Sequence, residues 1–363
     1  MNEGMLQELG VVREQIDAID AQLLVLLNQR AKCAQHVGEI KARYGDAGYI
    51  YRPEREAQVL RRIQGLNAGP LPNESITFFF REVMSACLSL ETPLGVAFLG
   101  PLGTFSESAA VKHFGHAARL APQGTIDDVF REVEAGHAHY GVAPVENSTE
   151  GAVGRTLDLL LGSPLKICGE VVLRIHQHLM TRETELGRIT KVYSHAQSLA
   201  QCHEWLNRSL PGIPRISVGS NAEAARLAAQ EPGAAAIAGE AASERYVLPR
   251  LVESIEDEPN NTTRFLVLGR HDAGRTGADK TSLIMSAANR PGAVHELLAP
   301  LAEAGVSMSR LESRPARAAL WEYVFYVDIE GHREDPGVKA ALDALARRAA
   351  YLKILGSYPQ AVY

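Results

Sequence analysis

The sequence predicts a multidomain fold with three parts: an all-α region over residues 1–92, an α/β region over 93–272 and an α+β region of ferredoxin-like order over 278–363. Apolar residues alternate in steps of four and three from residue 12 to residue 40, which is typical of a long helix packed along its length. Short buried-strand patterns then alternate with helical patterns. The final region has the order strand, helix, strand, strand, helix, strand.

The composition excludes several classes of protein. The chain has 363 residues, of which 46 % are hydrophobic and 22 % charged, as in an ordinary soluble globular protein. Its formal net charge of −6 argues against a nucleic-acid or anionic-membrane partner. Met1 to Gly10 lacks the basic and apolar parts of a signal peptide, and no apolar run is long enough to cross a bilayer. We therefore expect a cytoplasmic protein.

Cysteines, histidines and glycines give no sign of a metal or a cofactor. Four cysteines lie far apart without a Cys-x-x-Cys pair, so they are expected to be free thiols in a reducing compartment. His137 and His139, like His176 and His178, lack the spacing of helical metal ligands. The glycine fingerprints of dinucleotide and P-loop sites are missing. The sequence predicts neither metal nor cofactor.

The first long helix carries a cation in its apolar seam. The seam positions are Val12, Ile16, Ile19, Leu23, Leu26, Arg30, Cys33, Val37 and Ile40. A buried Arg30 needs an anionic partner, and a ligand is a candidate. Lys41 shares this face about 16 Å further along, so both side chains could reach one small dianion. Arg13 is about 42 Å from Lys41 along a straight helix, so it is either a surface residue or part of a second subunit's site.

Two more helices complete the N-terminal region. One opens at Arg52 and Pro53, where proline is harmless in the first turn. The next runs from about Asn73 to Leu90, and Glu91 shares a face with Cys87. Three such helices cannot enclose a pocket alone. A dimer that shares the long helix could do so.

These residues resemble the all-helical chorismate mutase domain. The matching series is Arg13, Arg30, Lys41, Arg55, Glu56, Cys87 and Glu91. Members of that family are intertwined dimers with one arginine supplied by the partner chain, which is the position that the resemblance gives to Arg13. Many relatives have Ser and Gln in place of Cys87 and Glu91, and Arg52 stands where some have an acid. These departures leave the carboxylate-binding arginines in place but could alter the pH dependence.

The resemblance implies a pericyclic rearrangement of chorismate to prephenate. Such a reaction needs the reactive conformer held still and donors placed at the ether oxygen as its charge grows. Arg13, Arg30 and Arg55 would hold the two carboxylates, while Arg52 and Cys87 would line the same site. Lys41 and a protonated Glu91 would face the ether oxygen, and Glu56 would accept from the ring hydroxyl. The alternative is a solvated helical bundle with no ligand.

Polar clusters follow several strands of the α/β region. The clusters are Pro101–Ser106, Glu146–Gly151, Ser194–Gln197 and Asn260–Phe265. Strand ends of this kind bind ligands in α/β folds. Asn260–Phe265 joins amides, hydroxyls and one guanidinium, which suits a small multiply anionic ligand. The alternative is a polar turn whose side chains cap their own backbone.

Three of these clusters, Pro101–Ser106, Glu146–Gly151 and Asn260–Phe265, resemble motifs of prephenate dehydratase. The resemblance covers nearly the whole α/β region. That family has two α/β lobes with the active site in the cleft, like a small-ligand binding protein, and it removes CO₂ and hydroxide from prephenate. By resemblance, Thr263 assists departure of the hydroxyl. The residues that would bind or polarise the substrate are Thr104, Glu146, Asn147, Ser194, Gln201 and Arg264. Glu146 could be an acid or an orienting group, and Ser194 and Gln201 could be structural.

After a polar linker at 274–279, the last region resembles the ACT domain of this dehydratase family. Two motifs, Asn289–His295 and Glu312–Pro315, carry the resemblance. In the family these motifs bind L-phenylalanine across a dimer interface. The effector residues implied here are Gly292, Ala293, Val294, His295, Glu312, Ser313 and Arg314. The alternative is a dimerisation domain without a ligand.

Taken together, the resemblances imply a bifunctional chorismate mutase–prephenate dehydratase of phenylalanine biosynthesis, inhibited by L-phenylalanine. We expect a homodimer or a tetramer of it. The rival hypothesis is a non-enzymatic amino-acid sensor, which would not need Arg13, Arg30, Lys41 and Glu56 arranged for a dianion. A mutase fused to a prephenate dehydrogenase would need the nucleotide fingerprint that the chain lacks.

Overall fold

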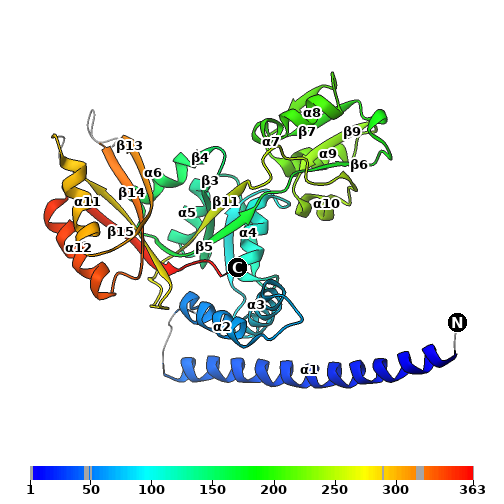
Figure 1. The fold of residues 1–363 in the computed structure, drawn as a ribbon, viewed down its shortest axis with the longest axis horizontal. Coiled ribbons are helices and arrows are strands. Elements are labelled where there is room, and N and C mark those ends of the chain that lie inside the picture. Colours follow the sequence, from blue (N-terminus) through cyan, green and yellow to red (C-terminus); the bar gives the residue numbers. More distant parts are fainter. Residues whose placement is uncertain (1–2, 45–48, 50, 288–289, 316–322, 363) are drawn as a thin grey trace.

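The computed structural model describes residues 3–44, 49, 51–287, 290–315 and 323–362. Three regions follow one another along the chain, as Figure 1 shows. Helices α1 to α3 come first, two α/β lobes follow, and a four-stranded sheet with two helices ends the chain. The predicted fold class is therefore confirmed. Within the described residues, no helix is both long and apolar enough to cross a membrane.

The first helix meets the rest of the described chain along its C-terminal half and leaves its N-terminal half exposed. Helix α1 (Glu3–Arg43) has 41 residues and buries none of them, while α2 (Pro53–Leu66) and α3 (Asn73–Ser89) pack on each other beside the lobes (Figure 1). Seam residues such as Ile16, Ile19 and Leu23 are 50–55 % exposed. The heptad pattern correctly predicted the helix, but a single chain leaves its apolar stripe uncovered.

Lobe 1 is built on a mixed six-stranded sheet of order β2-β1-β3-β11-β5, with β4 paired to β3. Its strands are β1 (Gly95–Leu99), β2 (Arg119–Gln123), β3 (Tyr140–Asn147), β4 (Gly151–Ala152), β5 (Lys166–Arg174) and β11 (Thr262–Gly269). Its helices are α4 (Phe105–Phe114), α5 (Ile126–Glu134) and α6 (Gly154–Gly162). Strand β11 returns from the other lobe and lies antiparallel between β3 and β5.

Lobe 2 has a five-stranded sheet of order β10-β6-β9-β7-β8. Its strands are β6 (His178–Thr181), β7 (Lys191–Ser194), β8 (Arg215–Ser217), β9 (Ala234–Ala238) and β10 (Arg250–Val252). Its helical segments are η1 (Leu186–Arg188), α7 (Ala196–Gln201), α8 (His203–Ser209), α9 (Asn221–Ala228) and α10 (Glu240–Tyr246). The chain crosses between the lobes at 175–177 and 253–261, so the ends of β3 and β11 lie at the junction.

The C-terminal sheet has the order β13-β14-β12-β15, the ferredoxin-like arrangement predicted. Its elements are β12 (Asp279–Ser286), α11 (Ala293–Glu303), β13 (Met308–Pro315), β14 (Tyr323–Glu330), α12 (Pro336–Arg348) and β15 (Tyr351–Pro359). Helices α11 and α12 cover one face through an apolar core that includes Leu283, Leu297 and Leu345.

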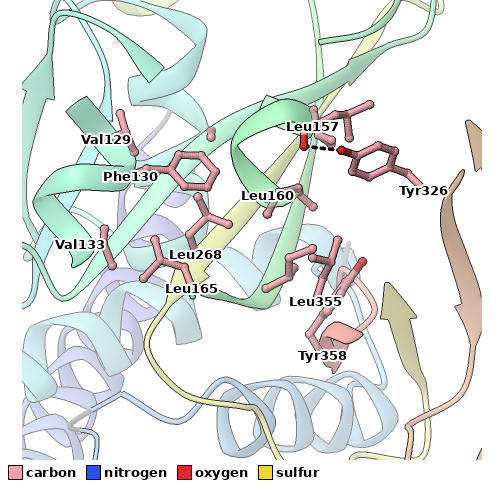
Figure 2. Close-up of a cluster of buried hydrophobic side chains, with 14 of the residues drawn as sticks. Val129, Phe130, Val133, Leu157, Leu160, Leu165, Leu268, Tyr326, Leu355 and Tyr358 are labelled. Carbon is pink, nitrogen blue, oxygen red and sulfur yellow. Dashed lines mark hydrogen bonds between the residues drawn. The ribbon is translucent and has the colours of Figure 1, made fainter. Parts of the chain in front are cut away.

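The other face of this sheet packs on lobe 1, where Figure 2 shows one continuous apolar cluster. Leu157 and Leu160 of α6 meet Leu355 and Tyr326, whose hydroxyl donates to the Leu157 carbonyl at 2.7 Å. Gly356 sits so close to β5 that a Cβ there would lie 2.2 Å from the Ile167 carbonyl oxygen. The α+β region therefore shares part of its apolar core with lobe 1.

Candidate active sites

A cavity of about 330 Å³ opens where the three helices meet lobe 1. Helix α1 contributes Arg30 and Lys41, and α2 contributes Arg55 and Glu56 together with the preceding Arg52. The remaining walls are Val37, Tyr51, Val59, Met84, Ser85, Leu88, Ser89, Leu94, Phe114, Ala117 and Ala118. Four cations and one carboxylate thus converge over an apolar floor, which suits a small dianion with a hydroxyl group.

Lys41 and Glu91 lie together beside this cavity, with Nζ 3.8 Å from Oε2. One turn before Lys41, Gly38 gives Glu91 room, since a Cβ there would lie 3.1 Å from its Cγ. Cys87 is buried on α3 one turn before Glu91. Neither Cys87 nor Glu91 is among the described residues that line the cavity, although both stand next to it.

The Glu56 carboxyl is largely buried and pairs with a further cation, Arg81. Its Oε1 lies 3.4 Å from Nε of Arg81 on α3. Burial raises the pKa of Glu56 to about 7, and the charge of Arg81 partly offsets that rise. Sequence reasoning missed Arg81, although a lone cation after the apolar run Phe78–Phe80 was a usable signal.

Arg13 lies away from this cavity. It is exposed near the free end of α1, 28 residues before Lys41, which corresponds to about 42 Å of helix. No contact in the single chain brings it to Arg30 or Lys41. The structure thus unites Arg30, Lys41, Arg52, Arg55 and Glu56 and leaves Arg13 for another partner.

A second group of polar side chains gathers where the lobes meet. Asn147 is buried, and its Nδ2 donates to Oγ1 of Thr263 and to Oδ1 of Asn261, both at 2.9 Å. Its Oδ1 accepts from the amide of Thr149 at 3.1 Å. Because the Thr263 oxygen accepts from Asn147, its hydrogen is available to another acceptor. The pair is therefore a fixed hydroxyl donor at the mouth of the cleft.

Gln201 of lobe 2 reaches across to this group, with Nε2 3.4 Å from Oε1 of Glu150. A cavity of about 240 Å³ lies between them. Its lining is Thr149, Glu150, Ala200, Gln201, Glu256, Asp257, Glu258 and Asn261. A larger hollow of about 930 Å³ opens between α3, α4, β5 and α10. Among the described residues, Asn147 and Thr263 line neither hollow, but Asn147 hydrogen-bonds Asn261 and Thr149, which line the smaller one. The polar cleft is therefore the better candidate site.

Two of the predicted substrate ligands have structural partners. Ser194 is fully buried at the end of β7, and its hydroxyl donates to the Ile237 carbonyl at 2.7 Å and lies 3.0 Å from Oδ1 of Asn221. Thr104 caps the N-terminus of α4 and donates to the Pro101 carbonyl at 3.0 Å. Both side chains fix the loops around the cleft, which favours the structural alternative for Ser194.

Glu146 and Arg264 turn away from the cleft. A β-bulge between Arg264 and Phe265 shifts the pairing of β11 with β3, so Arg264 stands opposite Glu146. Arg264 donates to Glu170 at 2.8 Å and to Tyr358 at 2.9 Å, and it pairs with Asp328. Oε2 of Glu146 lies 3.1 Å from Nε of Arg310. Both residues therefore face the C-terminal sheet.

The predicted effector residues lie on two elements of the C-terminal region. Gly292 has φ +79° and starts α11, where Ala293 is buried and Val294 is 41 % exposed. Glu312 and Ser313 lie on the edge strand β13, and Arg314 pairs with Asp158 of α6 at 3.1 Å. The described residues contain no cluster of His, Cys, Asp and Glu able to hold a metal ion.

Comparisons with known proteins match each region. Family models match residues 12–92 (chorismate mutase type II), 96–273 (prephenate dehydratase) and 281–347 (ACT domain). A bifunctional chorismate mutase/prephenate dehydratase of Neisseria gonorrhoeae is 58 % identical over 353 residues, which is 96 % of each chain. The chain belongs to this family of bifunctional enzymes. The counterpart from Pseudomonas aeruginosa is 52 % identical over 98 % of each chain.

A solved member of the dehydratase family supports the fold of the lobes and the C-terminal sheet. The prephenate dehydratase of Arthrobacter aurescens in complex with L-Phe superposes with a TM-score of 0.67 at 36 % identity. It covers 73 % of this chain and 89 % of its own. Below, the cavity around Arg30 and Lys41 is called the mutase cavity. The cleft near Asn147 and Thr263 is called the dehydratase cleft.

Proposed function

We propose that the chain rearranges chorismate to prephenate in the mutase cavity, converts prephenate to phenylpyruvate in the dehydratase cleft, and is inhibited by L-phenylalanine at its ACT domain. The observation that carries the proposal is the full-length relationship to bifunctional enzymes, with both sets of polar residues assembled in their own regions. No step of this chemistry requires a metal or a redox cofactor.

The mutase cavity has the groups that a pericyclic rearrangement needs. Arg30 and Arg55 bind the two carboxylates and hold the substrate in its reactive conformer. Lys41 and Glu91 stand where donors can meet the ether oxygen, on which negative charge grows. The Glu56 carboxylate accepts from the ring hydroxyl while Arg81 holds it in place.

A homodimer completes this cavity in the proposal. The uncovered stripe of α1 needs a partner helix, since more than ten large apolar side chains of α1 are exposed in the single chain. Two antiparallel copies of α1 would bring the partner's arginine at position 13 to the cavity around Lys41. A tetramer would need a further interface. The four free cysteines, three of them buried, suit the reducing cytoplasm in which we place the enzyme.

The dehydratase cleft assists loss of a hydroxyl. The bond to the ring carboxylate breaks and releases CO₂, its electron pair forms a ring double bond, and the ring hydroxyl leaves with a proton as water. Thr263 donates to that hydroxyl, and Asn147 fixes the orientation of Thr263. The contacts of Glu146 favour an orienting role over an acid, because its carboxylate is held by Arg310 outside the cleft.

The mutase reaction is expected to slow in acid. Because an ionised Glu56 is a stronger hydrogen-bond acceptor than the protonated acid and its pKa is about 7, kcat/KM for chorismate should fall as the pH drops below that value, by up to about tenfold per pH unit. Position 91 is tested by a permanent donor, since a carboxylate repels the growing charge on the ether oxygen whereas an amide donates to it. Glu91→Gln should therefore be at least as active as the wild type at neutral pH and should keep the acidic decline that Glu56 sets.

The measurement is kcat/KM for chorismate across pH for the wild type and Glu91→Gln. A large loss of activity at neutral pH in Glu91→Gln would show that a neutral donor at position 91 does not serve the ether oxygen. An activity that stays level from pH 8 to pH 5, about two units below the Glu56 pKa, would remove Glu56 from the acceptor role.

Substitutions in the effector motif are expected to weaken inhibition by L-phenylalanine without stopping dehydratase turnover. Glu312→Ala and Ser313→Ala should each weaken inhibition by L-phenylalanine while leaving dehydratase turnover in place, because β13 lies outside the cleft. Inhibition curves of prephenate turnover against L-phenylalanine measure this. Unchanged curves in both variants would show that the effector binds elsewhere.

The proposal as a whole is tested by incubating the protein with chorismate and no added cofactor. Phenylpyruvate, measured by its absorbance in alkali, should accumulate, and L-phenylalanine should suppress it. The rival sensor would bind L-phenylalanine without consuming chorismate. That result would contradict the proposed function.

A further inference from the structure

The ends of β3 and β11 present different side chains to their two faces. Asn147 stands opposite Thr263 and also hydrogen-bonds Asn261 and Thr149, two residues that line the dehydratase cleft. The preceding pair, Glu146 and Arg264, stands opposite each other and faces the ACT sheet. The bulge beside Arg264 produces this split, since it re-aims the strand ends. A group that holds Glu146 or Arg264 therefore also sets the backbone that carries Asn147 and Thr263.

Two residues of the ACT sheet hold these strand ends. Arg310 and Asp328 are direct neighbours on β13 and β14, just as Glu146 and Arg264 are on β3 and β11. Nε of Arg310 lies 3.1 Å from Oε2 of Glu146, and Nη1 of Arg264 lies 2.5 Å from Oδ2 of Asp328. Arg264 also lies 3.9 Å from Glu146. We call these four residues the charge square.

Three corners of the charge square are shielded from solvent, whereas the fourth, the Glu146 side chain, is 39 % exposed. The side chains of Arg310, Arg264 and Asp328 are 10 %, 13 % and 6 % exposed. Burial tends to raise the pKa of Asp328, but Arg264 and the hydroxyl of Ser282 lower it overall, so this carboxyl is ionised. Removing one partner from such a buried set leaves an uncompensated charge, so the geometry is sensitive to each member.

Arg310 is the less constrained of the two cations in the square. Its Nε and Nη2 are buried, and no described residue accepts a well-aligned hydrogen bond from them. Arg264, in contrast, is fixed by Glu170, Asp328 and Tyr358. The contact of Arg310 with Glu146 thus depends on charge and proximity, and a small displacement of β13 would lengthen it.

Strand β13 also carries the effector motif. Glu312 follows Arg310 by two residues, about 7 Å along a strand, and Ser313 comes next. Strands β13 and β14 are paired throughout this stretch, so a ligand that displaces Glu312 or Ser313 also displaces Arg310. Two side-chain contacts therefore join the sheet that carries Glu312 and Ser313 to the strand ends at the cleft. One is Arg310 with Glu146, and the other is Asp328 with Arg264.

We propose that the charge square couples L-phenylalanine binding to the dehydratase cleft, with Arg310 as the positioning residue that links β13 to the strand end carrying Asn147. The proposal rests on the proposed function and names the route of its regulation. In the absence of effector, Arg310 holds Glu146 and keeps Asn147 aligned with Thr263. Effector binding moves β13, weakens this contact and lowers dehydratase turnover.

The test is Arg310→Gln in the full-length chain, assayed for both reactions with and without saturating L-phenylalanine. We expect the ratio of dehydratase kcat/KM without and with effector to fall to about 1, which means that coupling is lost. Basal kcat for prephenate should decrease, and calorimetry should still detect L-phenylalanine binding. Mutase activity in the same chain reports that the variant is folded. Arg310→Lys, which keeps the charge, should recover part of the ratio.

A matched control is Arg333→Gln. Arg333 is also an ACT arginine paired with a lobe 1 carboxylate, since it donates to both oxygens of Asp272 at 3.0 and 3.1 Å, but it lies outside the square. This variant should keep the wild-type ratio. Equal loss in Arg333→Gln and Arg310→Gln would overturn the proposal, because any weakening of the interface would then suffice.

A wild-type ratio in Arg310→Gln would also overturn it. If that variant fails to fold, Asp328→Asn removes charge from the corner next to Arg310 and is expected to lower the ratio in the same way; a wild-type ratio there counts against the square. Failure of the proposed function looks different, since the wild-type protein would then lack dehydratase turnover or a response to L-phenylalanine.

Discussion

Thr263→Ala is expected to lower kcat for prephenate by about 10²–10³-fold, the usual loss when one preorganised donor is removed from a reacting oxygen. The substitution removes the hydroxyl that Asn147 orients and that we assign to the leaving group. Chorismate mutase activity should stay near the wild-type value, because Arg30 and Lys41 lie in another cavity. Both activities are measured on the same purified protein.

Thr190→Ala is the matched control. It makes the same truncation in the same region, and its hydroxyl also donates a hydrogen bond, to the Gly233 carbonyl at 3.1 Å, but it lies outside the cleft. This variant should keep its dehydratase turnover. Loss of both activities in a folded Thr263→Ala protein would contradict the assignment of two separate sites.

Arg13→Ala and Arg30→Ala should each be nearly inactive as mutases, because each removes a carboxylate anchor from a site that needs both. The structure makes the first of these informative. Arg13 is exposed and about 42 Å from Lys41 in its own chain, so its loss should have no effect unless a partner chain uses it.

Mixed dimers distinguish an Arg13 that acts in the partner subunit's site from an Arg13 that acts in its own. When the two variants are co-expressed, one of the two sites in a mixed dimer lacks neither arginine, so up to about half of the activity per mixed dimer should return. Absence of recovery in proven mixed dimers would place Arg13 in the site of its own subunit.

Local patterns in the sequence predicted a large part of the fold. The heptad seam predicted α1, and Pro53 marked the start of α2, because both signals depend only on nearby residues. The order of strands and helices predicted the ferredoxin-like sheet. Sequence patterns could not show that this sheet shares a core with lobe 1, since the contact of Gly356 with Ile167 joins residues far apart in the chain.

The sequence predicted which residues belong to the sites better than it predicted where their side chains lie. Arg30, Lys41 and Glu56 meet in one cavity as expected. Glu146 and Arg264 were expected among the substrate ligands of the cleft, but a single bulged residue turns them toward the ACT sheet. Arg81 and Arg310 were missed, because their meaning comes from the carboxylates they meet across the fold.

The most direct test of two independent sites in one chain is a mixture of separately purified Arg30→Ala and Thr263→Ala proteins supplied with chorismate. Either variant alone should yield phenylpyruvate at no more than about 1 % of the wild-type rate, because the first makes little prephenate and the second dehydrates it about 10²–10³-fold more slowly. The mixture should produce phenylpyruvate, since prephenate released by one protein is consumed by the other. A mixture that stays inactive, although Thr263→Ala consumes chorismate and Arg30→Ala consumes added prephenate, would contradict exchange between two separate sites. Phenylpyruvate formed by Thr263→Ala alone at a rate close to that of the wild type would contradict the assigned role of Thr263.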